Sequence, residues 1–180
     1  MHNSLTVVAL WVLWCGRERW RLSLGDEAAA LAFLAVHSLA AHWLYSNVPY
    51  DRWSQQVFGL SINAVMGWER NHFDRLVHFL YGVCLTPALS AWARATWHVS
   101  RRHSGVLAWG LVVVTGVVYE WMEWGVALAM SPEAAEAYNG QQGDPWDAHM
   151  DMLLAALGSM LTLALARWRR PDGPGTRRAS

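Results

Sequence analysis

The 180-residue chain contains no lysine and only two cysteines, and only 16% of its residues are charged. Its 14 basic residues are therefore all arginine, and 14 acidic residues balance them. A net charge near zero gives no indication of nucleic-acid binding, so we expect no nucleic-acid partner. Cys15 and Cys84 stand alone in separate apolar runs, a pattern that argues against a disulfide framework and a thiolate metal site.

Hydrophobic residues make up 54% of the chain, and 13 tryptophans are among them. This composition is typical of membrane proteins. A transmembrane helix needs about 20 apolar residues to cross a hydrocarbon core of about 30 Å. Runs of suitable length and polarity cover residues 28–45, 73–97, 106–130 and 148–168. The sequence therefore predicts an all-α, polytopic helical membrane protein.

A further apolar run covers residues 5–15, but it is short for a transmembrane helix. It either spans by tilting or lies at the interface, so we expect about five transmembrane helices, or four if the first is interfacial. Residues 1–170 are predicted to form one transmembrane domain, followed by a disordered cytoplasmic tail at 171–180. The N-terminus has no basic segment ahead of its apolar run, so no cleaved signal peptide is expected.

The arginines are distributed unevenly between the two predicted sides of the membrane. Connections rich in arginine face the cytoplasm, and alternate connections carry 11 of the 14: Arg17, Arg19, Arg21, Arg94, Arg101, Arg102, Arg167, Arg169, Arg170, Arg177 and Arg178. Ten of the 14 acidic residues fall on the opposite side. The pattern predicts a cytoplasmic C-terminus and a polar site that faces outward.

Other residue types suggest roles in membrane anchoring and helix packing. The connection at 46–71 contains a moderately apolar segment that could form an interfacial helix, and residues 131–147 are predicted to be an acidic loop. Aromatic anchors at the level of the lipid headgroups are predicted at Tyr81, Tyr119, Trp43, Trp97, Trp146 and Trp168. Close helix packing is predicted at Gly82, Gly116, Gly125 and Gly158.

An aspartate and a histidine are placed one helical turn apart at the start of the predicted helix 73–97. Asn71 and Asp74 suit the cap and the third position of a helix start, which by itself would explain both residues. His78 has no such explanation. Because it follows Asp74 by four residues, the pair can place a carboxylate and an imidazole on one cation, or the carboxylate can orient the imidazole.

Two glutamates lie inside the most apolar of the predicted helices. At 1.5 Å per residue, Glu120 and Glu123 fall roughly 10 to 15 Å from the outer end. Ionisable groups at such a depth are costly and are functional candidates. Since the two share a helix face, they need a metal, an arginine or a shared proton. An ion pair with Arg75 or a hydrogen bond to His78 is the structural alternative.

The segment GQQGDPWDAHMD opens the last predicted helix. Asp144 suits the cap position, with Pro145 at the first helical position and Asp147 at the third. Asp151 lies one turn further on the same face, where capping does not require it. Asp151 is therefore the stronger candidate for a functional role.

We expect these three clusters to meet at one end of the bundle and to form a metal site. Carboxylates and imidazoles without thiolates suit Zn, Mn, Fe(II) or Mg, as in bundle sites built on facing helices. The candidate metal ligands are Asp74, His78, Glu120, Glu123, Asp147 and Asp151, and Asp144 could join them. The candidate catalytic residues are Glu120, Glu123 and Asp151. His72 and His149 could join but are better explained as interfacial residues.

Three functions fit this site, and the residues leave open whether the protein is an enzyme. The first is a metal-dependent hydrolase acting on a lipid or an envelope-linked substrate in the bilayer. The second is a protein that binds or transports a cation or a proton, which would need a polar path beyond Thr86, Ser90 and Thr162. The third is a small accessory subunit of a membrane complex, and a homo-oligomer is also compatible with the sequence.

Three segments resemble a known family: RNHFDRLVHFLYG, VYEWMEW and GQQGDPWDAHMDMLLAALG are similar to the signature segments of the YjdF-type bacterial inner-membrane family, which has no assigned function. The likeness covers about residues 36–166 and implies a multi-pass inner-membrane protein. It singles out nine positions: His72, Asp74, Arg75, His78, Glu120, Glu123, Asp144, Asp147 and Asp151. The N-terminal region is shorter than the family's, and INAVMGWE resembles an insertion. A weaker likeness to VanZ-like membrane proteins is analogy alone.

Overall fold

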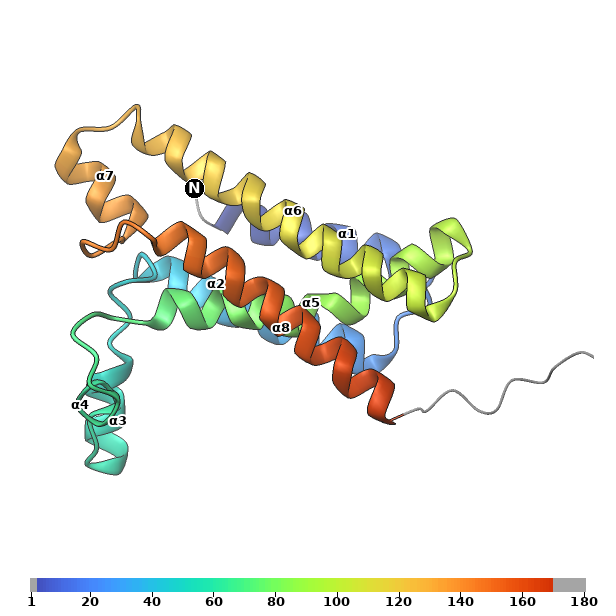
Figure 1. Ribbon diagram of the computed structural model, residues 1–180, viewed down its shortest axis with the longest axis horizontal. Helices are drawn as coiled ribbons and strands as arrows, with labels where there is room; N and C mark the ends of the chain where they lie inside the picture. Colours follow the sequence, from blue (N-terminus) through green and yellow to red (C-terminus); the bar gives the residue numbers. More distant parts are fainter. Residues whose placement is uncertain (1–2, 170–180) are drawn as a thin grey trace, which may run out of the picture.

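The computed structural model describes the backbone of residues 3–169 and the side chains of residues 6–131, 134, 135 and 138–167. Over this range the chain forms eight helices and no strand (Figure 1). They are α1 (Asn3–Gly16), α2 (Leu24–His42), α3 (Tyr50–Phe58), α4 (Ile62–Met66), α5 (Phe73–Trp97), α6 (Arg101–Ala127), α7 (Pro132–Asn139) and α8 (Asp147–Arg169). The prediction of an all-α fold is confirmed.

Four of these helices, α2, α5, α6 and α8, are long and apolar enough to cross a membrane. They confirm the predicted polytopic architecture. The 14 residues of α1 are too few to cross the hydrocarbon core alone. Helix α1 packs on α2 and runs alongside the long helices in Figure 1, so the count of long helices is four rather than five.

Helix α5 is the centre of the bundle and packs against α2, α6 and α8. Its contact with α8 is the closest: a Cβ added to Gly82 would overlap the carbonyl oxygen of Ala155, and one added to Gly158 would overlap that of Phe79. The predicted role of these two glycines in close packing is therefore correct. For Gly116 and Gly125 it is wrong, because nothing lies within 4 Å of an added Cβ at either position.

Polar residues outside the apolar runs extend two helices beyond their predicted starts. Ser23 and Asp26 form a capping box, in which the Asp26 amide donates to Ser23 Oγ and the Ser23 amide donates to Asp26 Oδ2, so α2 begins at Leu24. Ser100 caps α6 by accepting from the His103 amide. Apolar runs mark the part of a helix that crosses the hydrocarbon, whereas caps decide where the helix begins.

The short helices α3, α4 and α7 gather at one end of the bundle, together with the N-termini of α5 and α8 and the C-terminus of α6 (Figure 1). We call this end the acidic end. The predicted loop at 131–147 contains α7, which starts with proline at its first helical position and whose preceding residue Ser131 accepts from the Ala134 amide. The predicted interfacial segment at 58–68 contains only the short helix α4, because α3 ends at Phe58, just before Gly59, which has a φ of 67°.

The opposite end of the bundle carries arginines. Arg19 and Arg21 line one hollow with Arg94, so the first connection lies beside the C-terminal end of α5. The cytoplasmic orientation of this end stays a prediction. Arg170, Arg177, Arg178 and the predicted tail at 171–180 lie outside the described residues.

Candidate functional site

The start of α5 brings Asp74 and His78 together. Asn71 Oδ1 accepts from the Phe73 amide at 3.0 Å, and α5 begins there, one residue later than a cap at Asn71 itself would place it. Spacing of four residues puts Asp74 and His78 on one face. The distance between Asp74 Oδ1 and His78 Nε2 is 3.5 Å.

Asp151 of α8 completes a group of three potential metal ligands. One ligand atom each from Asp74, His78 and Asp151 lie within 4.8 Å of one another. Asp151 is only 3% exposed, and its Oδ1 has no hydrogen-bond partner. Two helices separated by 49 residues of chain thus bring two carboxylates and an imidazole to one point, the kind of donor set that suits a divalent cation.

The two glutamates of α6 take different places. Glu120 Oε1 lies 3.9 Å from His78 Nε2 and has no hydrogen-bond partner. Glu123 lies one turn nearer the end of α6, where it interacts with Tyr119 and is not part of the three-residue group. Neither glutamate is paired with Arg75, which is turned towards other carboxylates.

Two arginines hold the carboxylates at the start of α8. Arg70 Nη1 lies 3.1 Å from Asp144 Oδ2 and Arg70 Nη2 lies 2.7 Å from Asp147 Oδ1, although the latter pair is not aligned as a hydrogen bond. Arg75 Nη2 donates to Asp144 Oδ2 and lies 3.7 Å from Asp147 Oδ1. Asp147 is therefore a partner of both arginines. Arg70 is a part of the site that the sequence did not single out.

Asp144 both caps the start of α8 and binds the arginines. Its Oδ1 accepts from the Trp146 amide at 2.9 Å, while its Oδ2 takes the two arginines. The Trp146 amide, with Arg75 and Arg70, holds the pKa of Asp144 below its usual range. Burial, followed by the charges of Arg75 and Arg70, lowers the pKa of His72, whose Nδ1 accepts from Arg75 Nη1 at 3.3 Å. His72 thus contacts Arg75 and is not part of the three-residue group of Asp74, His78 and Asp151.

The connection before α8 is tied to the start of α5. The Asn71 amide donates to Gln142 Oε1 at 2.8 Å, and Gln142 Nε2 donates to the Asn71 carbonyl at 3.0 Å. Gly140 has a φ of 63°, and an added Cβ there would lie 2.5 Å from Ser46 Oγ, so glycine is required on both grounds. These contacts fix Asp144 and Asp147 relative to α5. His149, by contrast, is exposed beside Trp146.

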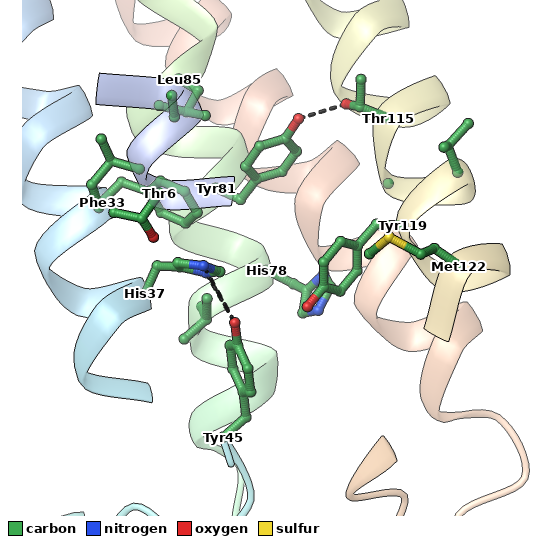
Figure 2. A pocket seen from close by; sticks show the side chains of 15 residues that line it. Thr6, Phe33, His37, Tyr45, His78, Tyr81, Leu85, Thr115, Tyr119 and Met122 are labelled. Carbon is green, nitrogen blue, oxygen red and sulfur yellow. Dashed lines mark hydrogen bonds between the residues drawn. The ribbon is translucent and has the colours of Figure 1, made fainter. Parts of the chain in front are cut away.

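A cavity of about 330 Å³ adjoins the three-residue group, and His78 lines it (Figure 2). The Tyr45 hydroxyl contacts His37 Nδ1 at 3.1 Å, and the Tyr81 hydroxyl contacts Thr115 Oγ1 at 2.5 Å. Tyr81 and Tyr119 both line this cavity, so their predicted role as headgroup anchors is wrong. Their polar ends find partners inside the bundle, which the position of a tyrosine in an apolar run does not reveal.

The comparisons with known proteins agree with this architecture. Residues 1–172 match the family described as "Predicted membrane protein (DUF2238)", so the chain belongs to this family. It is 33% identical over 134 residues to the inner membrane protein YjdF of Escherichia coli (strain K12), a match that covers 72% of this chain and 59% of YjdF. No solved structure matches the chain. The predicted resemblance is confirmed, and with the four long helices it identifies a multi-pass inner-membrane protein.

Proposed function

We propose that this member of the family is a metal-dependent hydrolase, with a divalent cation held by Asp74, His78 and Asp151 at an outward-facing site, and with a lipid or an envelope-linked molecule as its substrate. The observation that carries the proposal is the uneven charge of the acidic end. Among the described residues of α5, α6 and the start of α8, six buried or half-buried carboxylates at this end lie near two arginines, Arg70 and Arg75: they are Asp74, Glu120, Glu123, Asp144, Asp147 and Asp151.

The arginines are already occupied. Arg70 and Arg75 pair with Asp144 and Asp147, which leaves Asp74, Glu120 and Asp151 without a cationic partner among the described arginines. Carboxylates this close repel one another when ionised, and a buried charge must be paired or must coordinate a metal. The partnerless oxygens Oδ1 of Asp151 and Oε1 of Glu120 supply acceptor atoms without protein donors. A divalent cation would balance this excess of negative charge.

The donor set fits a hard or borderline cation such as Zn, Mn, Fe or Mg. Such a cation makes a bound water acidic enough to act as a nucleophile near neutral pH. Glu120 is the best placed general base, because its free oxygen lies 3.9 Å from His78 Nε2. Asp147 would position the arginines at the rim of the site, and Glu123 would act through Tyr119 rather than on the metal.

The packing on the far side of the site favours a hydrolase over a transport path. Further along α5 and α8, away from the acidic end, the fully buried Thr86 hydroxyl donates a hydrogen bond to the Ser159 hydroxyl at 2.7 Å. The contact of Gly82 with α8 lies at the same level and leaves no space there. In the part of the chain that the structure describes, no carboxylate continues the site towards the arginine end between α5 and α8.

The test is elemental analysis of the full chain purified in detergent, beside Asp151→Asn and His78→Ala. We expect close to one equivalent of a divalent metal in the wild-type protein and a large loss in both variants. Glu69→Gln is the matched control, because it removes an exposed carboxylate outside the cluster and should leave the metal content unchanged.

A thermal-stability assay keeps the test decisive if a variant folds poorly. A cation that binds only the folded protein raises its melting temperature, so added Zn or Mn should stabilise the wild type and Glu69→Gln but not Asp151→Asn. Absence of metal from the wild type, together with no stabilisation by added cations, would contradict the proposal and favour a role as a structural subunit.

A further inference from the structure

The cavity beside the candidate metal centre is open on one side. Val118 and Met122 of α6 line it, yet they are 55% and 42% exposed. Helix α1 covers part of the cavity through Thr6 and Ala9, but in Figure 1 it begins at Asn3, short of the acidic end. Helices α2 and α6 do not pack closely on each other. The opening therefore lies along α6, on the side that faces α2.

The walls of the cavity are mainly apolar, and they come from four helices: Ala9, Phe33, Leu34, Val77, Leu85 and Val118. Tyr81 and Thr115 also line the cavity, and their hydroxyl groups form a hydrogen bond with each other. Because α2, α5 and α6 are membrane-spanning helices, hydrocarbon rather than water lies outside the opening. An apolar space gives water few partners, and an empty space loses the dispersion contacts of its lining. A flexible hydrocarbon chain fits both conditions.

One end of the cavity is polar. Figure 2 shows His37, Tyr45, His78 and Tyr119 near one another, whereas Leu85 lies at the other end with the Tyr81–Thr115 pair. His78 belongs to both places, since it lines the cavity and lies 3.5 Å from Asp74. The cavity thus has the polarity of a lipid, with its polar end at the three-residue group and its apolar end deeper in the bundle.

We infer that the cavity takes one hydrocarbon chain of a membrane lipid, which enters between α2 and α6 and brings the polar group at the head of that chain to Asp74, His78 and Asp151. What happens to that group rests on the proposed hydrolase function. The inference goes further than that function, because it selects a bilayer lipid over a soluble or polymeric envelope substrate.

Gly116 provides the test. It lies on α6, lines the cavity and has nothing within 4 Å of an added Cβ, so Gly116→Leu fills the cavity without a backbone clash. Gly110→Leu on the same helix is the matched control, because it also has open space and does not line the cavity. Both changes replace a helical glycine with a better helix former.

The full chain is placed in nanodiscs of phosphatidylethanolamine and phosphatidylglycerol that contain a trace of phosphatidylglycerol with a diazirine halfway along one acyl chain. After illumination, mass spectrometry locates the adducts. We expect more labelling on Val77 and Leu85 than on Val114, a residue of α6 that is 58% exposed and does not line the cavity. In Gly116→Leu the cavity labelling should fall to the level of Val114, while Gly110→Leu should retain it.

Equal labelling of Val77 and Val114 in the wild type, or cavity labelling that Gly116→Leu leaves intact, would overturn the inference. The metal content of the same samples separates this outcome from failure of the hydrolase proposal. If metal is present but the cavity is not labelled, the proposed metal site stands and the inference of a bound lipid chain is wrong. If the cavity is labelled but no metal is present, the inference of a bound lipid chain stands and the hydrolase proposal is wrong.

Discussion

Thr162 of α8 donates a hydrogen bond at 3.0 Å to the carbonyl oxygen of Val83 in α5. That carbonyl would normally accept from the amide of the residue four positions later, which is Pro87 and has no N–H. Inside a membrane an unsatisfied carbonyl is costly, and a hydroxyl from a neighbouring helix can replace the missing donor. The α5–α8 contact therefore compensates for the proline within α5.

The first prediction follows from this pair. Thr162→Val should reduce the free energy of unfolding by about 0.6 to 1.7 kcal/mol, which are the average and the largest values from double-mutant cycles on hydrogen bonds between membrane helices. In a Pro87→Ala background the alanine amide satisfies Val83, so the same change should cost much less. Equilibrium unfolding in mixed micelles of the four proteins in this double-mutant cycle measures the coupling. Equal costs in both backgrounds would show that Thr162 acts through packing alone.

The second prediction concerns the ion pair of Arg70 with Asp147. The two side chains are 14% and 5% exposed, so removal of one partner leaves a buried charge. Arg70→Gln should destabilise the protein by about 3 kcal/mol or more, a typical loss for a broken buried pair. Adding Asp147→Asn should recover part of this loss, because the uncompensated carboxylate is then gone. Thermal unfolding in detergent measures both effects, and Glu69→Gln is the exposed control. A loss for Arg70→Gln no greater than that for Glu69→Gln would be incompatible with this pairing.

The third prediction concerns pH and the contact of α3 with α4. The Asn63 amide, which donates to Asp51 Oδ1 at 2.8 Å, lowers the pKa of Asp51, and Ser61 and Gln55 add to this effect. A carboxyl group with a lowered pKa stabilises the fold fully above its unfolded pKa, about 3.9. This stabilisation is lost as the pH falls below that value through the lowered pKa of the folded protein.

Hydrogen exchange at the α4 amides, corrected for intrinsic rates, measures this effect. We expect protection that is constant from pH 7 to about 5 and that decreases on further acidification. Asp51→Asn keeps an acceptor for the Asn63 amide but cannot titrate, so its protection should not change over the acidic range. A variant that follows the same pH curve as the wild type would assign the transition to another group.

Residues that act within one helix could be predicted from the sequence. The Asp74 and His78 pair and the positions of the four long helices depend on spacing along the chain. Helical periodicity and apolar length report such relationships directly. The family resemblance was also visible, because its three motifs occur in order.

The membrane sidedness of the polar residues predicted that the three clusters meet at one end of the bundle, but the individual contacts between helices could not be predicted in the same way. Arg70 meets Asp144 across 74 residues, and Tyr81 meets Thr115 across 34 residues. No local sequence pattern predicts with which of several carboxylates an arginine pairs. Nor does it predict whether a tyrosine side chain points towards a lipid headgroup or into a cavity. The same limit separates Gly82, which touches α8, from Gly116, which faces open space, although both are glycines in apolar helices.

The backbone contact at Gly82 and Gly158 also limits how the molecule can move. Two helices that meet through glycines and a buried Thr86–Ser159 hydrogen bond behave as one rigid body, and Asp74, His78 and Asp151 are all fixed to it. Glu120 is carried by α6, whose contacts with α5 and with α8 are each less extensive than the contact between α5 and α8. In the proposed hydrolase, a movement of α6 would therefore change the distance from Glu120 to Asp74, His78 and Asp151 without altering the geometry of those three residues.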